Sequence, residues 1–155
     1  MKLSAPLFCL IGFCLPLAPA NADIAADKVT ATRVFEEKTD RGDFSNLDEI
    51  YAPGFVAHGG DKSYTLEEDN ASGRAIRAAV PDLKVSIERL VGEGEMVAVH
   101  WRASGTNTVA AAGMPGQGKV VKVEGMTMFR FQAGRIVEEW SLTDRLSLLR
   151  QLDAL

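Results

Sequence analysis

The sequence predicts an α+β domain in which a strongly curved antiparallel sheet packs against about three N-terminal helices and forms a cone open at one end. Two observations favour this fold class. Apolar residues recur at helical spacing over residues 25–80 and alternate with polar residues over residues 83–143. Glycine-containing turns separate the alternating segments, which is typical of hairpins in an antiparallel sheet.

The helical half of the chain divides into three segments. Apolar spacing predicts helices over residues 25–41, 45–51 and 65–80. The third begins with a capping box at residues 65–68 (TLEE), where hydroxyl and carboxylate oxygens accept the first free backbone N–H groups. It ends before Pro81, because the residue preceding a proline is disfavoured in a helix.

The strand half shows period-two alternation. It predicts strands over residues 83–91, 96–104, 119–131 and 135–143, and a short apolar run at 55–58 can add a fifth. In the last strand, the alternation places Glu138 and Trp140 on the face of Ile136. Residues 105–118, rich in glycine and alanine, predict a long mobile connection that could act as a lid, and residues 145–155 predict a closing helix.

The N-terminus is typical of a cleavable signal peptide. Lys2 precedes an uncharged apolar run at residues 7–17, and Ala20-Asn21-Ala22 has the small-residue pattern that signal peptidase accepts. The alternative, a retained anchor, is less favoured because the run is shorter than the roughly 20 residues that a membrane helix needs. We therefore expect residues 1–22 to be removed and residues 23–155 to form one domain without a membrane span, exported to the periplasm or the medium.

Composition excludes several classes of function. Both cysteines, Cys9 and Cys14, lie in the predicted signal peptide, so cysteine catalysis, disulfides and cysteine-ligated zinc are not expected in the domain. The formal net charge is −4, and the basic residues are scattered. A nucleic-acid partner is not expected, because phosphate binding requires a basic stripe.

Four segments in order resemble one family. They are residues 44–58, 97–106, 123–134 and 135–152, and they are similar to the SnoaL-like proteins, also called ester cyclases, of the nuclear transport factor 2-like superfamily. The most specific piece is residues 136–140 (IVEEW), followed by Asp144 and then by residues 151–152. The resemblance implies a cone-shaped barrel with an internal apolar pocket, often a homodimer formed through the sheet.

The resemblance also implies catalytic chemistry. In polyketide cyclases of this family, an aspartate after the tryptophan strand serves as acid and base in an aldol closure, without a cofactor or metal; the matching position is Asp144. An acid–base residue of this kind needs a pKa tuned by its surroundings and a donor for the carbonyl oxygen. The alternative is that Asp144 simply caps the closing helix.

Further polar and apolar residues are candidates for the same site. His100 is the second catalytic candidate, and the pocket candidates are His58, Arg102, Trp140, Glu138, Met128 and Tyr51. Each has a structural alternative: a satisfied histidine, a core tryptophan or tyrosine, a gap-filling methionine, or a solvated Glu138 if the opposite face of its strand points inward. A metal site formed by His58 and His100 with a carboxylate has no supporting spacing, so no metal is expected.

Two functions remain open from the sequence. The first is an exported, cofactor-independent enzyme of the cyclase, isomerase or hydratase type, acting on a small apolar carbonyl compound. The alternative is a non-catalytic protein that binds a small hydrophobic molecule. The predicted export favours an environmental or envelope-derived molecule, because polyketide intermediates are made in the cytoplasm.

Overall fold

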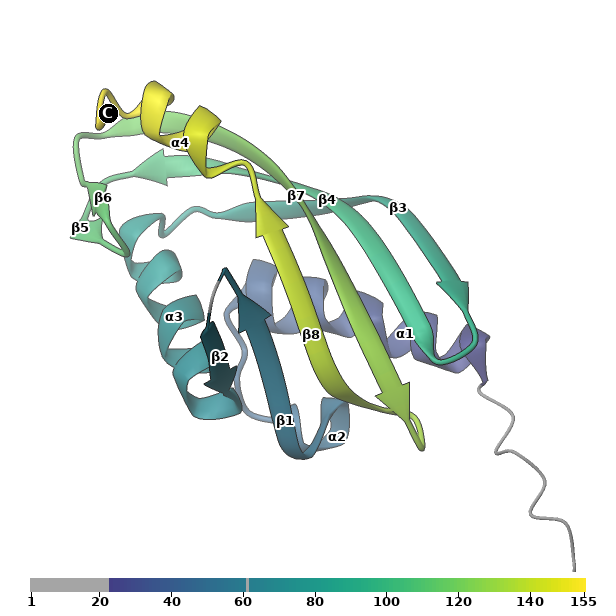
Figure 1. The fold of residues 1–155 in the computed structure, drawn as a ribbon. Helices are drawn as coiled ribbons and strands as arrows, with labels where there is room; N and C mark the ends of the chain where they lie inside the picture. Colours follow the sequence, from purple (N-terminus) through teal and green to yellow (C-terminus); the bar gives the residue numbers. More distant parts are fainter. Residues whose placement is uncertain (1–22, 61) are drawn as a thin grey trace, which may run out of the picture.

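The computed structural model describes residues 23–60 and 62–155 (Figure 1). The predicted signal peptide lies outside these residues. The helices are α1 (Ile24–Arg33), the π-helix η1 (Val34–Arg41), α2 (Leu47–Ile50), α3 (Leu66–Ala79) and α4 (Arg145–Gln151). The strands are β1 (Tyr51–Gly59), β2 (Lys62–Thr65), β3 (Lys84–Glu93), β4 (Met96–Asn107), β5 (Ala110–Ala111), β6 (Met114–Pro115), β7 (Lys119–Gln132) and β8 (Arg135–Thr143).

Six strands form one curved sheet in the order β2-β1-β8-β7-β4-β3. Neighbours are antiparallel except β1 and β8, which are parallel. The long strands β4 and β7 bend around a concave side, where α1 and α3 lie (Figure 1). The α+β fold class is therefore confirmed, and the helices expected to precede the strands are present. Among the described residues, no helix has the length and apolar character needed to cross a membrane.

The first predicted helix is two helices in sequence. After α1, the chain widens into η1, in which the Thr39 hydroxyl donates to the Val34 carbonyl five residues earlier at 3.1 Å. Gly42 ends it in a left-handed conformation, φ +67°, that a side chain would strain. Wide turns of this kind are frequent at functional sites, and here η1 presents Phe35 and Lys38 to the interior.

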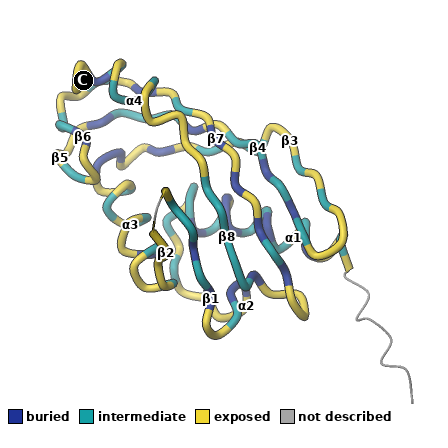
Figure 2. Tube along the Cα trace, viewed as in Figure 1, coloured by how far each residue is buried: buried dark blue, intermediate teal, exposed yellow. Residues whose placement is uncertain are grey.

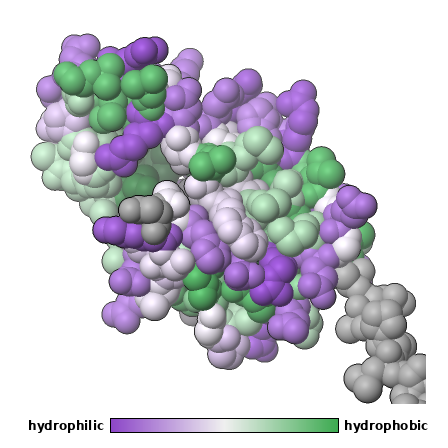
Figure 3. All heavy atoms as spheres, in the orientation of Figure 1, coloured by the Kyte–Doolittle hydropathy of each residue, from purple (hydrophilic) through white to green (hydrophobic). Residues whose placement is uncertain are grey.

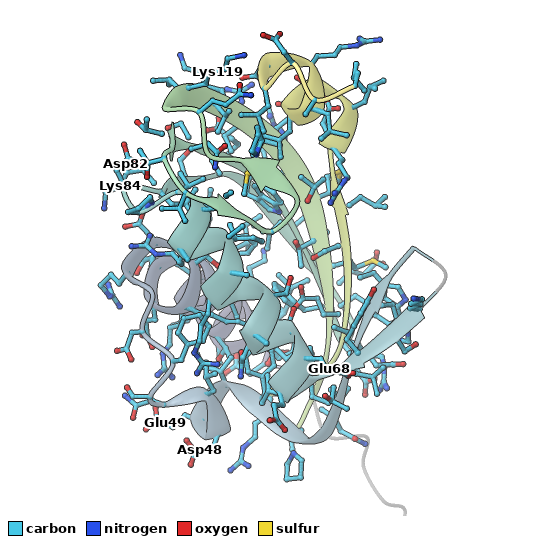
Figure 4. The ribbon with its side chains drawn as sticks, turned by 90° about the vertical axis from the view of Figure 1, so that its left-hand side faces the viewer. Asp48, Glu49, Glu68, Asp82, Lys84 and Lys119 are labelled. Atoms are coloured by element: carbon cyan, nitrogen blue, oxygen red, sulfur yellow. The ribbon has the colours of Figure 1, made fainter. Side chains whose placement is uncertain are left out.

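Helix α3 is fixed at both ends (Figure 4). At its start the predicted capping box forms, with Thr65 and Glu68 each accepting the other's backbone N–H. Beyond its end, the Asp82 carboxylate accepts hydrogen bonds from the backbone N–H and the hydroxyl of Thr106, at 2.6 and 2.8 Å. The Asp82 contacts fasten the segment that follows α3 to the end of β4.

The connection expected over residues 105–118 has more structure than the sequence predicts. Strand β4 continues to Asn107, and β5 and β6 pair as a small hairpin. The fully buried Asn107 amide donates to the carbonyls of Ala79 and Val109, at 3.0 and 3.1 Å, and accepts from the Gly116 N–H at 2.8 Å. The glycine-rich composition serves turns inside an ordered hairpin.

Two apolar clusters form the core. The larger packs α1, η1 and β1 against β4, β7 and β8, and its fully buried members include Ile50, Tyr51, Val97, Val99, Phe129, Phe131 and Ile136. The smaller lies near the hairpin and α4, and contains Val80, Leu83, Met114, Val121 and Leu152. Buried positions recur along the middle of β4 and β7 (Figure 2). The apolar space between the two clusters is where a cavity lies.

Candidate functional site

A cavity of about 350 Å³ lies on the concave side of the sheet. It is enclosed by η1, α3, α4 and the β5–β6 hairpin, and Figure 3 shows the surface hollowed beneath α4, with hydrophobic side chains inside the hollow. The apolar walls include Phe35, Val80, Leu83, Val85, Trp101, Met114, Val121, Val123, Phe129 and Leu148. Its volume falls within the usual range of small-molecule sites.

A bulge in β8 decides which side chains enter this cavity. Phe131 pairs with Ile136 but Arg130 pairs with Glu138, so Val137 is an extra residue in β8. The inward alternation therefore shifts by one position after Ile136. Glu139, opposite buried Phe129, faces the cavity, whereas Glu138 faces the convex side. The predicted shared face of Ile136, Glu138 and Trp140 is wrong for this reason.

The inward polar residues of three neighbouring strands form a hydrogen-bonded chain. The Trp101 Nε1–H donates to Thr127 Oγ1 at 3.0 Å, and Thr127 Oγ1 lies 2.8 Å from Ser141 Oγ. The Ser141 hydroxyl donates to Glu139 Oε1 at 2.8 Å. Because an indole N–H can only donate, the chain is satisfied throughout if both hydroxyls donate towards Glu139.

A buried ammonium group lies at the same end of the cavity. Lys38, only 7% exposed, forms an ion pair with Asp69, and its Nζ donates to the Tyr51 hydroxyl at 3.3 Å. Lys38, Asp69 and Glu139 all line the cavity. An ammonium group has three N–H donors, so one remains beyond these two contacts.

These surroundings shift two pKa values. Burial, with a further contribution from the Asp69 carboxylate, raises the pKa of Glu139 to about 7, against the opposing effects of Lys38 and the Ser141 hydrogen bond. The Glu139 side chain is half-buried: protein atoms surround it, and it is accessible from the cavity. Burial and the carboxylates of Glu139 and Asp69 also raise the pKa of Tyr51 well above its ordinary value, so its hydroxyl stays protonated.

This arrangement can move a proton near neutral pH. A carboxyl whose pKa lies near 7 populates both protonation states there, which suits a general acid or base. Within the described residues, Glu139 Oε2 accepts no hydrogen bond, so this oxygen remains for a ligand. The remaining Lys38 donor offers positive charge to an oxygen that becomes negative during a reaction.

The structure places Asp144 outside the cavity. Its side chain is exposed and accepts the Ser147 backbone N–H at 2.9 Å, which caps α4. Together with Arg102 and Glu124 it lines a separate pocket on the convex side. Asp144 was expected in the pocket or at its mouth; it does not line the cavity, although its neighbours Thr143 and Arg145 do, and its observed contact is that of the helix-cap alternative.

Most other predicted site residues also lie on the convex side. The His58 ring stacks on Trp140, with centroids 4.9 Å apart, and its Nε2 lies 3.3 Å from Glu138 Oε1. Arg130, followed by His58, lowers the pKa of Glu138 by hydrogen bonding. These residues do come together, but as a surface cluster.

The remaining candidates divide between the two sides of the sheet. His100 and Arg102 both approach the Glu124 carboxylate, at 3.6 and 3.3 Å, and Met128 is 40% exposed on the same convex face. Tyr51 alone belongs to the interior, where it contacts Lys38 behind the cavity wall. The described parts of the chain contain no group of three or more histidine, cysteine, aspartate or glutamate side chains arranged to hold a metal ion.

Sequence reasoning missed the inner polar residues, which are Lys38, Asp69, Thr127, Glu139 and Ser141. No short motif links Lys38 to Asp69, because the contact spans 31 positions. One signal was available for Glu139. Since successive strand residues face opposite sides, one of two consecutive glutamates in β8 has to point inward unless a bulge intervenes between them.

Comparisons with known proteins support this fold. The family model described as SnoaL-like polyketide cyclase matches residues 29–152. IdmH from Streptomyces antibioticus, assigned as a polyketide cyclase, is 28% identical with a TM-score of 0.72, over 82% of this chain and 98% of that one. TsrD from Streptomyces laurentii is 26% identical with a TM-score of 0.77, over 86% and 98% of the two chains. A comparison with curated proteins gives no match.

Proposed function

Because this chain belongs to the SnoaL-like polyketide cyclase family, we propose that it is a cofactor-independent acid–base catalyst of the cyclase type. Its substrate is a small apolar molecule that carries a carbonyl group. The observation that carries the proposal is Glu139, an inward carboxyl with a pKa of about 7 at the polar end of an apolar cavity. Such pairing of a tuned base with a shaped apolar pocket characterises enzyme sites.

The proposed reaction uses the two groups at the polar end of the cavity, Glu139 and Lys38. Glu139 Oε2 removes a proton from the carbon next to the carbonyl, and the electron pair of that C–H bond moves onto the carbonyl oxygen. The free N–H donor of Lys38 stabilises the enolate oxygen. The enolate carbon then attacks a second carbonyl of the same molecule, which closes a ring, and Glu139 returns the proton to the new alkoxide.

Asp69 positions Lys38, and the hydrogen-bonded chain of hydroxyl groups positions Glu139. Asp69 holds the Lys38 ammonium group in place through their ion pair. The chain from Trp101 through Thr127 and Ser141 orients Glu139 by occupying Oε1, which leaves Oε2 for the substrate. Orientation of this kind is a large part of what an enzyme contributes, because a misplaced base loses effective concentration.

The proposal includes action outside the cytoplasm. Its support is the signal-like pattern of residues 1–22, with Ala20-Asn21-Ala22 before the expected cleavage point. N-terminal sequencing of the protein recovered from the periplasm or medium of its own host should begin at Asp23. An N-terminus that retains residues 7–17 would remove this part of the proposal.

Proton abstraction can be measured without knowing the natural substrate. We expect the protein to accelerate exchange of the α-protons of 1-tetralone in D2O, followed by NMR, with a rate that rises with pH through about 7 as Glu139 ionises. Glu139→Gln should lower this rate about 100-fold or more, because general base catalysis contributes factors of that order.

Glu138→Gln makes the matched comparison, because it changes the preceding residue of the same strand on the convex face. Exchange should survive in Glu138→Gln and fail in Glu139→Gln. The opposite pattern would contradict the role of Glu139. Tight binding of 1-tetralone with no acceleration in the unaltered protein would instead favour the non-catalytic binding protein.

A further inference from the structure

Two arginines line the cavity, and their surroundings differ. The Arg77 guanidinium is held by backbone carbonyls: Nη1 donates to Asp40 and Leu83 at 2.8 and 3.1 Å, and Nη2 donates to Pro81 at 3.4 Å. Arg145, the first residue of α4, forms no ion pair or hydrogen bond through its guanidinium within residues 23–60 and 62–155. Arg77 therefore belongs to the wall, whereas Arg145 offers five unused donors.

The charges of the cavity are unevenly distributed. At the inner end, the single ammonium of Lys38 faces the two carboxylates of Asp69 and Glu139. The walls between are apolar side chains such as Leu83, Met114 and Phe129. A ligand carboxylate would meet Asp69 and the ionised Glu139 at the inner end, because Glu139 becomes neutral only after it takes the substrate proton, and it would be poorly solvated along the walls. Arg145 is thus the cavity-lining group that can receive it.

The hairpin packs directly against the Arg145 guanidinium. A Cβ atom at Gly113 would lie 3.1 Å from Arg145 Nη2, so the guanidinium lies against a position without a side chain. Gly113 has φ +72° and Ala112 has φ +52°, and Ala112 also lines the cavity. The smallest side chains of the hairpin therefore lie where the cavity meets the guanidinium.

We propose that Arg145 binds an anionic group, a carboxylate, at the outer end of the substrate, so that the substrate is an apolar oxo acid. The inference rests on the proposed function, which places the reacting carbonyl at Glu139. The residues Glu139 and Thr143, which both line the cavity, are four positions apart in β8, or about 13 Å along a strand. The ligand therefore carries its anion and its carbonyl at opposite ends of an apolar body.

A pair of near-isosteric ligands tests this assignment. 2-Naphthylacetate and 2-naphthylacetamide share an apolar body and differ in charge. Isothermal titration calorimetry at low salt should show about fivefold to tenfold tighter binding of the carboxylate, because a guanidinium–carboxylate contact is charge-assisted but here partly solvated. Arg145→Gln should abolish this preference and leave the affinity for the amide unchanged.

Arg150→Gln is the matched control, since Arg150 is an exposed arginine in the last turn of the same helix and does not line the cavity. The preference should persist in Arg150→Gln and in Glu139→Gln, so the result separates anion binding from catalysis. Three outcomes would overturn the proposal: equal affinity for the two ligands, binding of neither, or a preference that survives Arg145→Gln.

Discussion

The burial of Glu139 costs stability, and the same burial tunes this residue for the proposed chemistry. An ordinary glutamate has a pKa near 4.5, and burial raises that of Glu139 to about 7. The folded state then binds the extra proton between these two values, so the free energy of unfolding falls as the pH rises through this window. Functional residues often carry such a cost, because the environment that tunes a base also disfavours its charge.

Replacement of Glu139 by glutamine should remove this cost. Glu139→Gln should stabilise the fold by about 1–3 kcal/mol at pH 8, since a neutral amide avoids burying a carboxylate, and should change stability little at pH 4.5. Urea unfolding at the two pH values measures both differences.

Glu138→Gln should behave in the opposite way. Arg130 and His58 lower the pKa of Glu138, so its carboxylate stabilises the folded state above its ordinary pKa, and this contribution is lost as the pH falls. The variant should be less stable than the unaltered protein at pH 8. Equal responses of Glu138→Gln and Glu139→Gln would contradict the assignment of the two carboxylates to opposite faces.

At the scale of an element, β8 shows what periodicity can and cannot predict. The alternating pattern gives the strand over residues 135–143 with its observed bounds. It does not reveal the extra residue Val137, because a bulge is set by pairing with β7 and leaves the composition of the strand unaltered. A single unpredicted residue therefore moved Glu138 and Trp140 from the expected cavity to the convex surface.

The β5–β6 hairpin shows a second limit. Glycine and alanine at residues 105–118 suggest mobility, yet Asn107 joins the hairpin to the end of α3 through its amide. The partners of a buried amide lie far apart in sequence, so composition alone does not identify them. Whether the hairpin opens over a ligand stays a prediction.

At the scale of the whole molecule, the segregation of helices from strands was enough to predict the fold class. The cavity follows from the fold, because a curved sheet covered by helices at one side leaves space between two apolar clusters. The polar residues of the cavity cannot be predicted from the fold class, because Lys38, Asp69 and Glu139 lie in three elements that are far apart in the sequence. The site could be predicted only as a pocket, without its residues.

The convex face of the sheet is where a homodimer is expected. Its outward side chains include exposed apolar ones, namely Met126, Met128 and Leu142 at 55, 40 and 75% exposure, together with Val91 of β3. Scattered apolar side chains are common on surfaces, but Met126, Met128 and Leu142 lie on the adjacent strands β7 and β8, where Met126 pairs with Leu142. A two-fold axis would place this face against its own copy, so each substitution would act twice at the interface.

We therefore expect a dimer in sedimentation velocity, and a monomer for Met128→Glu, which would bury two carboxylates at such an interface. Val29→Glu, which alters an exposed valine of α1 away from this face, should remain dimeric. A monomeric unaltered protein, or a dimer that survives Met128→Glu, would contradict the prediction. Because the cavity lies on the opposite side of the sheet, the Met128→Glu monomer should still exchange the protons of 1-tetralone; loss of exchange would mean that assembly shapes the cavity.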